Sequence, residues 1–332
     1  MAAILVTGGA GYIGSHAVKA LRRAGFDVTV YDDLSAGHRE ATLGVPLIVG
    51  DIRDAVLLRR TLRDRRISAV MHFAALLNIA ESIRDPLSFY TINVAGTLTV
   101  LEAMRAESVR AFVFSSTCAV YGEPVQIPIP ESHPTQPVSA YGETKLAIER
   151  ALQYCDRAYG LRSISLRYFN ASGADPDGEL GEDHDPEIHI IPRAIGAVSG
   201  GPALQVFGTD YSTPDGTCLR DYIHVTDLAD AHVRALQSLG GRGDSTAYNL
   251  GCGRPFSVRE VIDAVGRAAG RPVPWTPAPR RPGDPAALYA RSERARTELG
   301  WTPTYEDLDD IVGTAWRWHA AHPHGYHAGV SR

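Results

Sequence analysis

Lysine is nearly absent from this chain of 332 residues, which contains Lys19 and Lys145 and no other lysine. Arginine supplies the remaining 31 of the 33 basic residues (33 less 2), and 38 acidic residues outnumber them. With a formal net charge of −5 and a pI near 6.2, the chain has no basic stripe of the kind that binds nucleic acid. We therefore expect no nucleic-acid partner, and we interpret the arginines late in the chain as ligands of a small anion.

Cysteine and long apolar runs are also scarce. Cys118, Cys155, Cys218 and Cys252 stand far apart without C-x-x-C spacing, which argues against a zinc site and against a disulfide framework. No stretch approaches the roughly 20 apolar residues of a membrane span, and the N-terminus lacks a signal-peptide pattern. We therefore expect no membrane association, no bound metal and a location in the cytoplasm.

Short apolar runs alternate with longer helical patterns through the first half of the chain. This rhythm predicts an α/β fold with a doubly wound parallel (Rossmann) sheet. After Asn170 a stretch rich in glycine, proline and aspartate follows. We expect a first domain over 1–170 and mainly a smaller α/β lobe over 171–332, with some later segments returning to the first domain. The expected buried strands are residues 4–6, 28–31, 47–49, 69–73, 111–114 and 164–166.

A glycine-rich turn follows the first expected strand. Gly8, Gly11 and Gly14 form a G-x-x-G-x-x-G pattern around Tyr12 and Ile13, where the strand gives way to a helix. Glycines let the backbone approach a pyrophosphate, whose charge then meets the free N–H groups and positive dipole of the helix start. In this strand–turn–helix context the pattern predicts a dinucleotide site.

Carboxylates at strand ends indicate which dinucleotide binds. Asp32 and Asp33 end the second strand, where a carboxylate can accept hydrogen bonds from the ribose hydroxyls of the adenosine half and repel a 2′-phosphate. NAD is therefore favoured over NADP. Asp51 is placed to reach the adenine edge, and capping of the following helix is an open alternative. The other expected contacts of this part of the cofactor are Ile52, Phe73 and Ala74.

Lys145 stands four residues after Tyr141, just past a proline-rich loop. Residues i and i+4 share a face of a helix, so the ammonium should lie beside the phenol and lower its pKa. A tyrosine with a lowered pKa can act as a base near neutral pH. Taken alone, the pair is also compatible with an incidental contact on a surface helix.

The fifth strand ends in Ser115, Ser116 and Thr117, whose hydroxyls should emerge where doubly wound folds bind ligands. A strand end of this kind, followed by a helix with Tyr-x-x-x-Lys, resembles the short-chain dehydrogenase/reductase superfamily. The glycine pattern and the chain length resemble its extended branch. The resemblance implies Tyr141 as the catalytic acid/base, Lys145 as the group that lowers its pKa and binds the nicotinamide ribose, and Thr117 as a partner of the reacting oxygen.

The chain further resembles the family of UDP-glucose 4-epimerases over essentially its whole length. The segments that carry this resemblance are residues 93–97, 166–170, 216–225, 248–251 and 278–284. It implies a UDP-hexose substrate, with the diphosphate, the uridine ribose and the uracil bound by different residues. The expected contacts of the diphosphate are Asn170, Arg220 and Arg281, and that of the uridine ribose is Asp284. The expected contacts of the uracil are Phe207, His189 and Ile190. Asn93 and Tyr168 are further expected contacts of NAD.

Three positions depart from, or vary within, the pattern of that family. Leu77 stands where several relatives carry a lysine, which removes a cation near the cofactor. His189 replaces an asparagine, so its contacts with the uracil edge differ. Leu288 stands where members that reject N-acetylated sugars resemble one another in carrying tyrosine, and where permissive members carry a smaller residue. Leucine is intermediate in size, and it predicts slow activity on N-acetylated sugars.

Other functions are less well supported by the residues of this chain. Dehydratases of the same branch need an Asp-Glu pair after the strand-five threonine, and the related decarboxylases use a Glu in that neighbourhood. This chain has Cys118 and Ala119 there, so only oxidation at one carbon and its reversal remain. A non-catalytic dinucleotide sensor would not need Tyr141 and Lys145 together. A metalloprotein reading would use a C-terminal histidine group that is more simply a solvated helix end, namely His319, His322, His324 and His327.

The resemblance implies a mechanism. Tyr141 as phenolate takes the proton of the sugar 4-hydroxyl while the C4 hydride passes to the nicotinamide. The 4-keto sugar then turns about its phosphate linkage and is reduced on its other face. Relatives are commonly homodimers that pair helices of the first lobe, and the corresponding segments here are 86–106 and 139–159.

Overall fold

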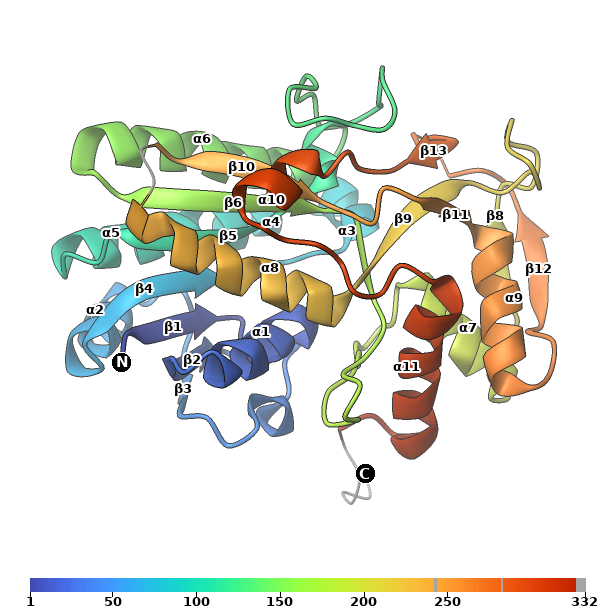
Figure 1. Ribbon diagram of the computed structural model, residues 1–332, viewed down its shortest axis with the longest axis horizontal. Helices are drawn as coiled ribbons and strands as arrows, with labels where there is room; N and C mark the ends of the chain where they lie inside the picture. Colours follow the sequence, from blue (N-terminus) through green and yellow to red (C-terminus); the bar gives the residue numbers. More distant parts are fainter. Residues whose placement is uncertain (242–243, 282, 327–332) are drawn as a thin grey trace.

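A seven-stranded parallel sheet forms the centre of the computed structural model, which describes residues 1–241, 244–281 and 283–326 (Figure 1). His327 and Pro282, both in segments singled out above, lie outside the described residues. From one edge of the sheet to the other the strands are β10 (Thr246–Leu250), β6 (Arg162–Tyr168), β5 (Ala111–Thr117), β4 (Ile67–His72), β1 (Ala3–Thr7), β2 (Asp27–Asp32) and β3 (Leu47–Val49).

The strand order reverses direction between β1 and β4. The chain runs from β1 outward to β2 and β3, crosses to β4 on the other side of β1, and continues to β5 and β6. Each of the six predicted strands is present, and the doubly wound parallel sheet is confirmed. Because such a reversal opens a crevice at the carboxyl ends of the strands, this edge is where the fold can hold a ligand.

Helices cover both faces of the sheet (Figure 1). One face lies against α1 (Tyr12–Arg23) and α8 (Val225–Ser238), which pack on each other and share one apolar core with the strands. The other face lies against α2 (Ala55–Asp64), α5 (Thr97–Ala106) and α6 (Ala140–Tyr159). Shorter segments are α3 (Ile79–Arg84), α4 (Pro86–Phe89), the π-helical turn Tyr90–Gly96 and α10 (Glu293–Glu298).

A second, smaller α/β unit has its own apolar core. In its main sheet β9 (Leu219–His224) pairs with β7 (Asn170–Ser172), β11 (Pro255–Ser257) and β13 (Ala287–Leu288). The smaller α/β lobe is therefore confirmed, whereas a boundary at residue 170 stays a prediction because β10 and α8 return to the first sheet. The remaining elements are β8 (Leu204–Phe207) with β12 (Trp275–Ala278), α7 (Ile190–Val198), α9 (Val258–Ala269) and α11 (Leu308–Ala321).

No helix among the described residues combines the length and the apolar character that crossing a bilayer requires.

Candidate active site

The glycine-rich turn brings three backbone segments very close together. Gly8 has φ +71°, and a Cβ at this position would lie 2.4 Å from the amide nitrogen of Ala74. A Cβ on Gly14 would lie 2.1 Å from the carbonyl oxygen of Gly8. A Cβ on Gly11 would meet only the Gly8 carbonyl oxygen, at 3.5 Å. The fold itself therefore requires glycine at positions 8 and 14. At position 11 it leaves room for a side chain.

The start of α1 is arranged as an anion site. Its N-cap is Gly11, which provides no side-chain cap, and its first turn carries no acidic residue. The first N–H groups of a helix have no acceptor within the helix, so the backbone at Tyr12, Ile13 and Gly14 can donate to a phosphate. The Tyr12 hydroxyl instead donates to the carbonyl of Gly173 at 2.6 Å, so this residue can serve a cofactor only through its backbone.

Asp32 is buried at the end of β2, beside the turn. Its two oxygens accept hydrogen bonds from the backbone N–H groups of Ala10 and Leu34, each at 2.9 Å. Burial raises its pKa, against these two amides. A carboxylate offers about four lone-pair sites, so acceptor capacity remains for ribose hydroxyls. The exposed Asp33 accepts from the backbone and hydroxyl of Ser35, at 2.9 and 2.6 Å.

Asp51 is engaged by its neighbour. Arg53 donates to both of its carboxylate oxygens, with Nη2 2.5 Å from Oδ2, and this pairing lowers the pKa of Asp51. The alternative that Asp51 caps the following helix is wrong, because Asp54 is the N-cap of α2. Ile52 is buried in the core beneath α2 and α5.

Asn93 fixes the loop that follows β4. Its Oδ1 accepts from the Leu76 N–H at 2.8 Å, and its Nδ2 donates to the Leu76 carbonyl at 3.0 Å and to the Thr144 hydroxyl at 3.2 Å. Phe73 and Ala74 begin this loop directly beside Gly8. The asparagine is fully buried, so in this structure it holds the backbone that the cofactor would approach.

Tyr141 and Lys145 lie on the first turns of α6, against the end of β5. Gly142 permits this approach, because a Cβ there would lie 2.5 Å from the carbonyl oxygen of Ala119. The Lys145 ammonium donates to the Ser115 carbonyl at 2.9 Å and lies 5.9 Å from the centre of the Tyr141 ring. Tyr141 is half-buried and Lys145 is buried. The two residues therefore share a site.

The electrostatics of the protein alone differ from the expectation for Tyr141. Burial raises the pKa of Tyr141 to about 12, although its hydrogen bond with the Thr117 hydroxyl acts in the other direction. Burial likewise lowers the pKa of Lys145 to about 7, against the attraction of Glu149. The prediction of a lowered phenol pKa is therefore wrong for the protein alone. Both groups lose hydration at this depth, and the ammonium points to a carbonyl oxygen.

A buried ion pair holds α6 against the sheet. Arg167 on β6 donates through Nε to Glu149 on α6 at 2.9 Å and through Nη2 at 2.5 Å. Ser116 donates to the same carboxylate at 2.5 Å, and Arg167 donates to the Tyr121 hydroxyl at 3.0 Å. Tyr168, the next residue on β6, is hydrogen-bonded to Ser115 through its hydroxyl. This network was not predicted.

Most of the residues expected to hold the nucleotide sugar lie on β7, β8 and β9 and in the segment between β12 and β13. Arg220 on β9 pairs with Asp284, and its Nη1 donates to the Leu219 carbonyl at 2.7 Å. The Arg281 guanidinium lies 4.0 Å above the ring of Phe207. Asn170 on β7 is next to β9, and its amide donates to the Asp221 carbonyl at 2.8 Å.

Leu288 links this group to the chemical centre. It pairs in register with Arg220 across β13 and β9, and it packs against an apolar cluster that includes Cys118, the residue after Thr117. Burial raises the pKa of the Cys118 thiol to about 12, so the thiol stays protonated and cannot serve as a base.

His189 and Ile190 lie at the start of α7. The His189 imidazole contacts Glu182, and its backbone N–H donates to Glu187 at 2.8 Å. Of the C-terminal histidines, His319 packs edge-on against Trp318, and His322 stacks on the same indole with ring centres 4.7 Å apart.

Asp221 is a residue of this region whose role was not predicted. It is fully buried, and its carboxylate accepts from the backbone N–H groups of Cys252, Gly253 and Ala290 at 2.8, 3.2 and 3.1 Å. Burial raises its pKa to about 6. The sequence carried no clear signal of this role, because β9 also contains Arg220 and His224 and only the fold shows that Asp221 is buried and requires donors. It anchors β9 to the chain around β13.

The fold and this edge of the sheet define an enzyme class built on a bound dinucleotide. The family model "NAD dependent epimerase/dehydratase family" matches residues 4–251. The chain belongs to this family.

The relatives within the family are more specific. UDP-glucose 4-epimerase of Halalkalibacterium halodurans is 53% identical over 325 residues, which cover 98% of this chain and 97% of that protein. The crystal structure of UDP-glucose 4-epimerase from Brucella ovis in complex with NAD has a TM-score of 0.93 and 49% identity, with 96% and 98% of the two chains covered. The Bifidobacterium longum enzyme in complex with NAD+ and UDP has a TM-score of 0.93 and 38% identity, covering 98% and 100%.

Alanine at two of the glycines should separate folding from cofactor binding. In Gly14→Ala the new Cβ overlaps the Gly8 carbonyl, so we expect the protein without nucleotide to lose about 1–3 kcal/mol of unfolding free energy. In Gly11→Ala the new methyl meets no protein atom closely, so the free energy of unfolding of the nucleotide-free protein should stay unchanged. Its NAD affinity should fall roughly 5- to 150-fold if the methyl intrudes on the ligand by a similar free energy.

Thermal denaturation of nucleotide-free protein and calorimetric titration with NAD measure the two effects. If the NAD affinity of Gly11→Ala were unchanged, the conclusion would be that the phosphates of NAD do not bind at this turn.

Proposed function

We propose that this chain is an NAD-dependent epimerase that interconverts UDP-glucose and UDP-galactose by inverting C4 of the hexose. The observation that carries the proposal is Tyr141 beside Thr117, with Lys145 buried next to them, at the sheet edge that also carries the glycine-rich turn. The near-full-length similarity to UDP-glucose 4-epimerases supports it.

The residues at the sheet edge fit NAD. The first turn of α1 offers backbone donors to a diphosphate without a competing side chain, and Asp32 offers acceptors where a ribose is expected. Lys145 lies within the same edge and can bind the nicotinamide ribose. NAD, when bound, supplies the acceptor for the C4 hydride and later returns it. The small residues at Gly8 and Ala74 leave the backbone accessible to the dinucleotide.

Tyr141 moves the proton of the sugar 4-hydroxyl. Because burial raises the pKa of Tyr141 to about 12, the phenol is protonated near neutral pH and holds the proton that the keto sugar takes up when it is reduced. Removal of the proton in the forward direction requires the phenolate, which the charge of Lys145 would stabilise. Thr117, hydrogen-bonded to Tyr141, orients the reacting oxygen. Cys118 and Ala119 offer no further acid or base, so the site lacks the groups that elimination or decarboxylation requires.

The smaller lobe binds the nucleotide part of the UDP-hexose substrate. Arg220 and Arg281 bind the diphosphate, because planar guanidinium groups match its oxygens. The Arg220–Asp284 pair gives both residues a fixed position before substrate arrives. Phe207 offers a flat apolar face to the uracil, and Asn170, His189 and Ile190 complete the site. We divide the chain accordingly into an NAD-binding domain, 1–170, and a mainly nucleotide-sugar-binding lobe, 171–332.

The free thiols are consistent with a cytoplasmic location. All four cysteines are unpaired, and Cys118, Cys218 and Cys252 are buried. Disulfides are rare in reducing compartments, and we place the enzyme there.

Tyr141→Phe should abolish turnover and leave NAD binding intact, because only the ionisable oxygen is removed. The measurement is conversion of UDP-galactose by purified protein, with and without added NAD, together with NAD titration. Tyr305→Phe, the same substitution in the smaller lobe, is the control and should keep the wild-type rate. Turnover of Tyr141→Phe near that rate would end the proposed mechanism.

Leu288 should decide how well N-acetylated sugars are accepted. Leu288 pairs with Arg220 across β13 and β9, and its side chain packs against the cluster that includes Cys118, so a larger ring there would reduce the space next to the sugar. We expect slow activity on the UDP-N-acetylhexosamine pair in the wild type and its loss in Leu288→Tyr, with activity on the UDP-hexose pair kept. Val56→Tyr on the exposed surface of α2 is the control. The readout is the ratio of kcat/KM for the two pairs; an unchanged ratio in Leu288→Tyr excludes this residue as the gate.

We also propose a homodimer that pairs segments 86–106 and 139–159 of two copies. These segments and the adjacent α3 expose large apolar side chains to solvent, and such patches mark interfaces. The residues are Ile83, Leu87, Tyr90, Leu98 and Tyr154.

A buried charge at this face should dissociate the dimer. We expect the wild type to have twice the mass of the 35.8 kDa chain in light scattering, and Leu98→Glu to have the mass of one chain. Val56→Glu, at an exposed apolar residue of α2, should remain dimeric. A wild type with the mass of one chain at micromolar concentration would contradict the proposal.

A further inference from the structure

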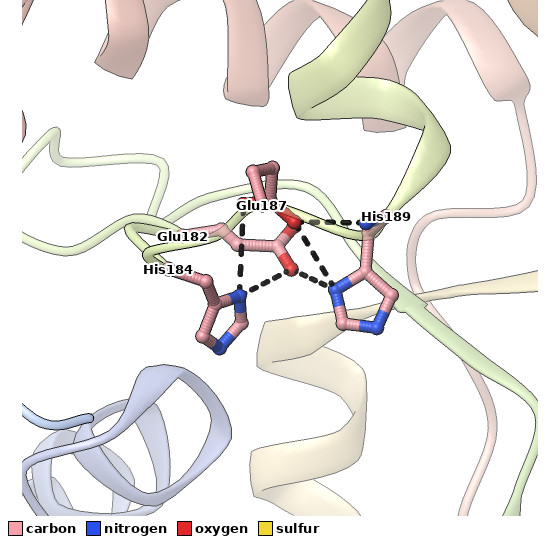
Figure 2. A group of neighbouring side chains, drawn as sticks. All are labelled: Glu182, His184, Glu187 and His189. Atoms are coloured by element: carbon pink, nitrogen blue, oxygen red, sulfur yellow. Dashed lines mark hydrogen bonds and ion pairs between the residues drawn. The ribbon is translucent and has the colours of Figure 1, made fainter. Parts of the chain in front are cut away.

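Two glutamates and two histidines converge in the segment between β7 and α7 (Figure 2). They follow the spacing E-x-H-x-x-E-x-H: Glu182, His184, Glu187 and His189. Each offers one nitrogen or carboxylate oxygen, and these four atoms all lie within 4.8 Å of one another. Figure 2 shows both imidazoles turning their Nδ1 atoms toward the carboxylates.

Several distances between these atoms are close to those between the ligands of a four-coordinate ion. Nδ1 of His184 lies 3.2 Å from Oε1 of Glu182 and 3.6 Å from Oε2 of Glu187. Nδ1 of His189 lies 3.7 Å from Oε1 of Glu187 and contacts Oε1 of Glu182. Zinc bonds of roughly 2.0–2.2 Å in tetrahedral geometry separate neighbouring ligand atoms by about 3.3–3.6 Å. Small side-chain shifts would place all four around one ion.

Half of the cluster is enclosed, and not all of its polar atoms are satisfied. The Glu182 and His184 side chains are 5% and 14% exposed, whereas those of Glu187 and His189 are 21% and 40% exposed. Nδ1 of His184 is inaccessible to solvent and makes no hydrogen bond, although two carboxylates face it. An unprotonated nitrogen facing carboxylates is repelled by them, so the arrangement requires either a proton on each Nδ1 atom or one cation between the four groups.

A neighbouring acidic group already has its cation. Asp175, Asp177 and Glu179 surround the Lys19 ammonium at 2.5, 2.9 and 2.6 Å. This group contains no imidazole, and its charge is compensated by the chain itself. It therefore provides an internal comparison for the Glu182 cluster.

We infer that Glu182, His184, Glu187 and His189 form a binding site for a divalent transition-metal ion of the zinc type. Two imidazoles favour zinc over magnesium and calcium, which prefer oxygen ligands. Two carboxylates and a dication sum to zero, so the buried site carries no net charge. Binding displaces any protons held by the two Nδ1 atoms, because a ligating imidazole must be neutral at that nitrogen.

The ion would be structural, since four protein ligands close a tetrahedral site. It would fix the segment that leads into α7, where His189 is the N-cap residue. The ring of Tyr12, on α1, meets the His184 ring edge-on with centres 6.2 Å apart. The site therefore lies where the start of the cofactor-binding helix meets the segment that enters the smaller lobe.

Metal analysis of untagged protein, grown with added zinc and purified without chelators, tests the site. We expect about one zinc ion per chain, located among these four residues by anomalous scattering at the zinc absorption edge. After removal of the ion, titration with Co²⁺ should give the intense visible absorption of tetrahedral cobalt. His184→Gln and Glu187→Gln should each weaken zinc binding by more than about 100-fold, since loss of a second-shell partner alone costs about 10–100-fold.

Matched variants keep the test specific. Asp177→Asn, in the acidic group around Lys19, and His322→Gln, at the end of α11, should bind zinc as the wild type does. Tyr141→Phe should also keep its zinc, so metal content is independent of the proposed reaction. Far-UV circular dichroism and NAD titration establish that each variant is folded.

Three results would overturn the inference. They are a wild type without zinc that does not take it up on titration, equal zinc affinity in His184→Gln and the wild type, and anomalous density only at other residues. In the first case each imidazole holds a proton on Nδ1 that faces the two carboxylates.

Discussion

The buried ion pair between Arg167 and Glu149 is the interaction on which the geometry of the candidate site depends. It joins β6 to α6, and through Ser116 and Tyr121 it also reaches the end of β5 and the loop that follows. A buried charge that lost its partner would be strongly destabilising, so the network keeps α6 in one position. That position sets where Tyr141 and Lys145 meet the end of the sheet.

Close backbone contact is the second constraint, and it acts at both sides of the same edge. Gly14 touches the Gly8 carbonyl and Gly8 touches Ala74, while Gly142 touches the Ala119 carbonyl. These contacts leave no room for a Cβ. They allow a cofactor and a catalytic helix to approach the same strand ends. The smaller lobe is anchored differently, by the buried Asp221 carboxylate and its three amide donors.

Charge compensation stabilises several of the buried charged groups that the structure describes. Lys19 is surrounded by acidic residues, and Arg220 is held by Asp284. Lys145 differs from these residues, because burial lowers its pKa to about 7 and its ammonium donates a hydrogen bond to the Ser115 carbonyl oxygen. A cation in such a place is costly and therefore responsive to a negative charge nearby, which is the property that a developing phenolate requires.

The parallel sheet and the glycine-rich turn could be predicted from the sequence. Each of the six expected strands is present, and Gly8 and Gly14 are required at close backbone contacts. These features depend on periodicity and on neighbours a few residues apart, which the sequence displays directly. Four other features required the folded structure. They are the place of β10 in the first sheet, the ion pair of Arg53 with Asp51, the raised pKa of Tyr141, and the convergence of Glu182 and His184 with Glu187 and His189. Burial and the folding of an irregular loop fix these outcomes, and neither leaves a periodic trace in the chain.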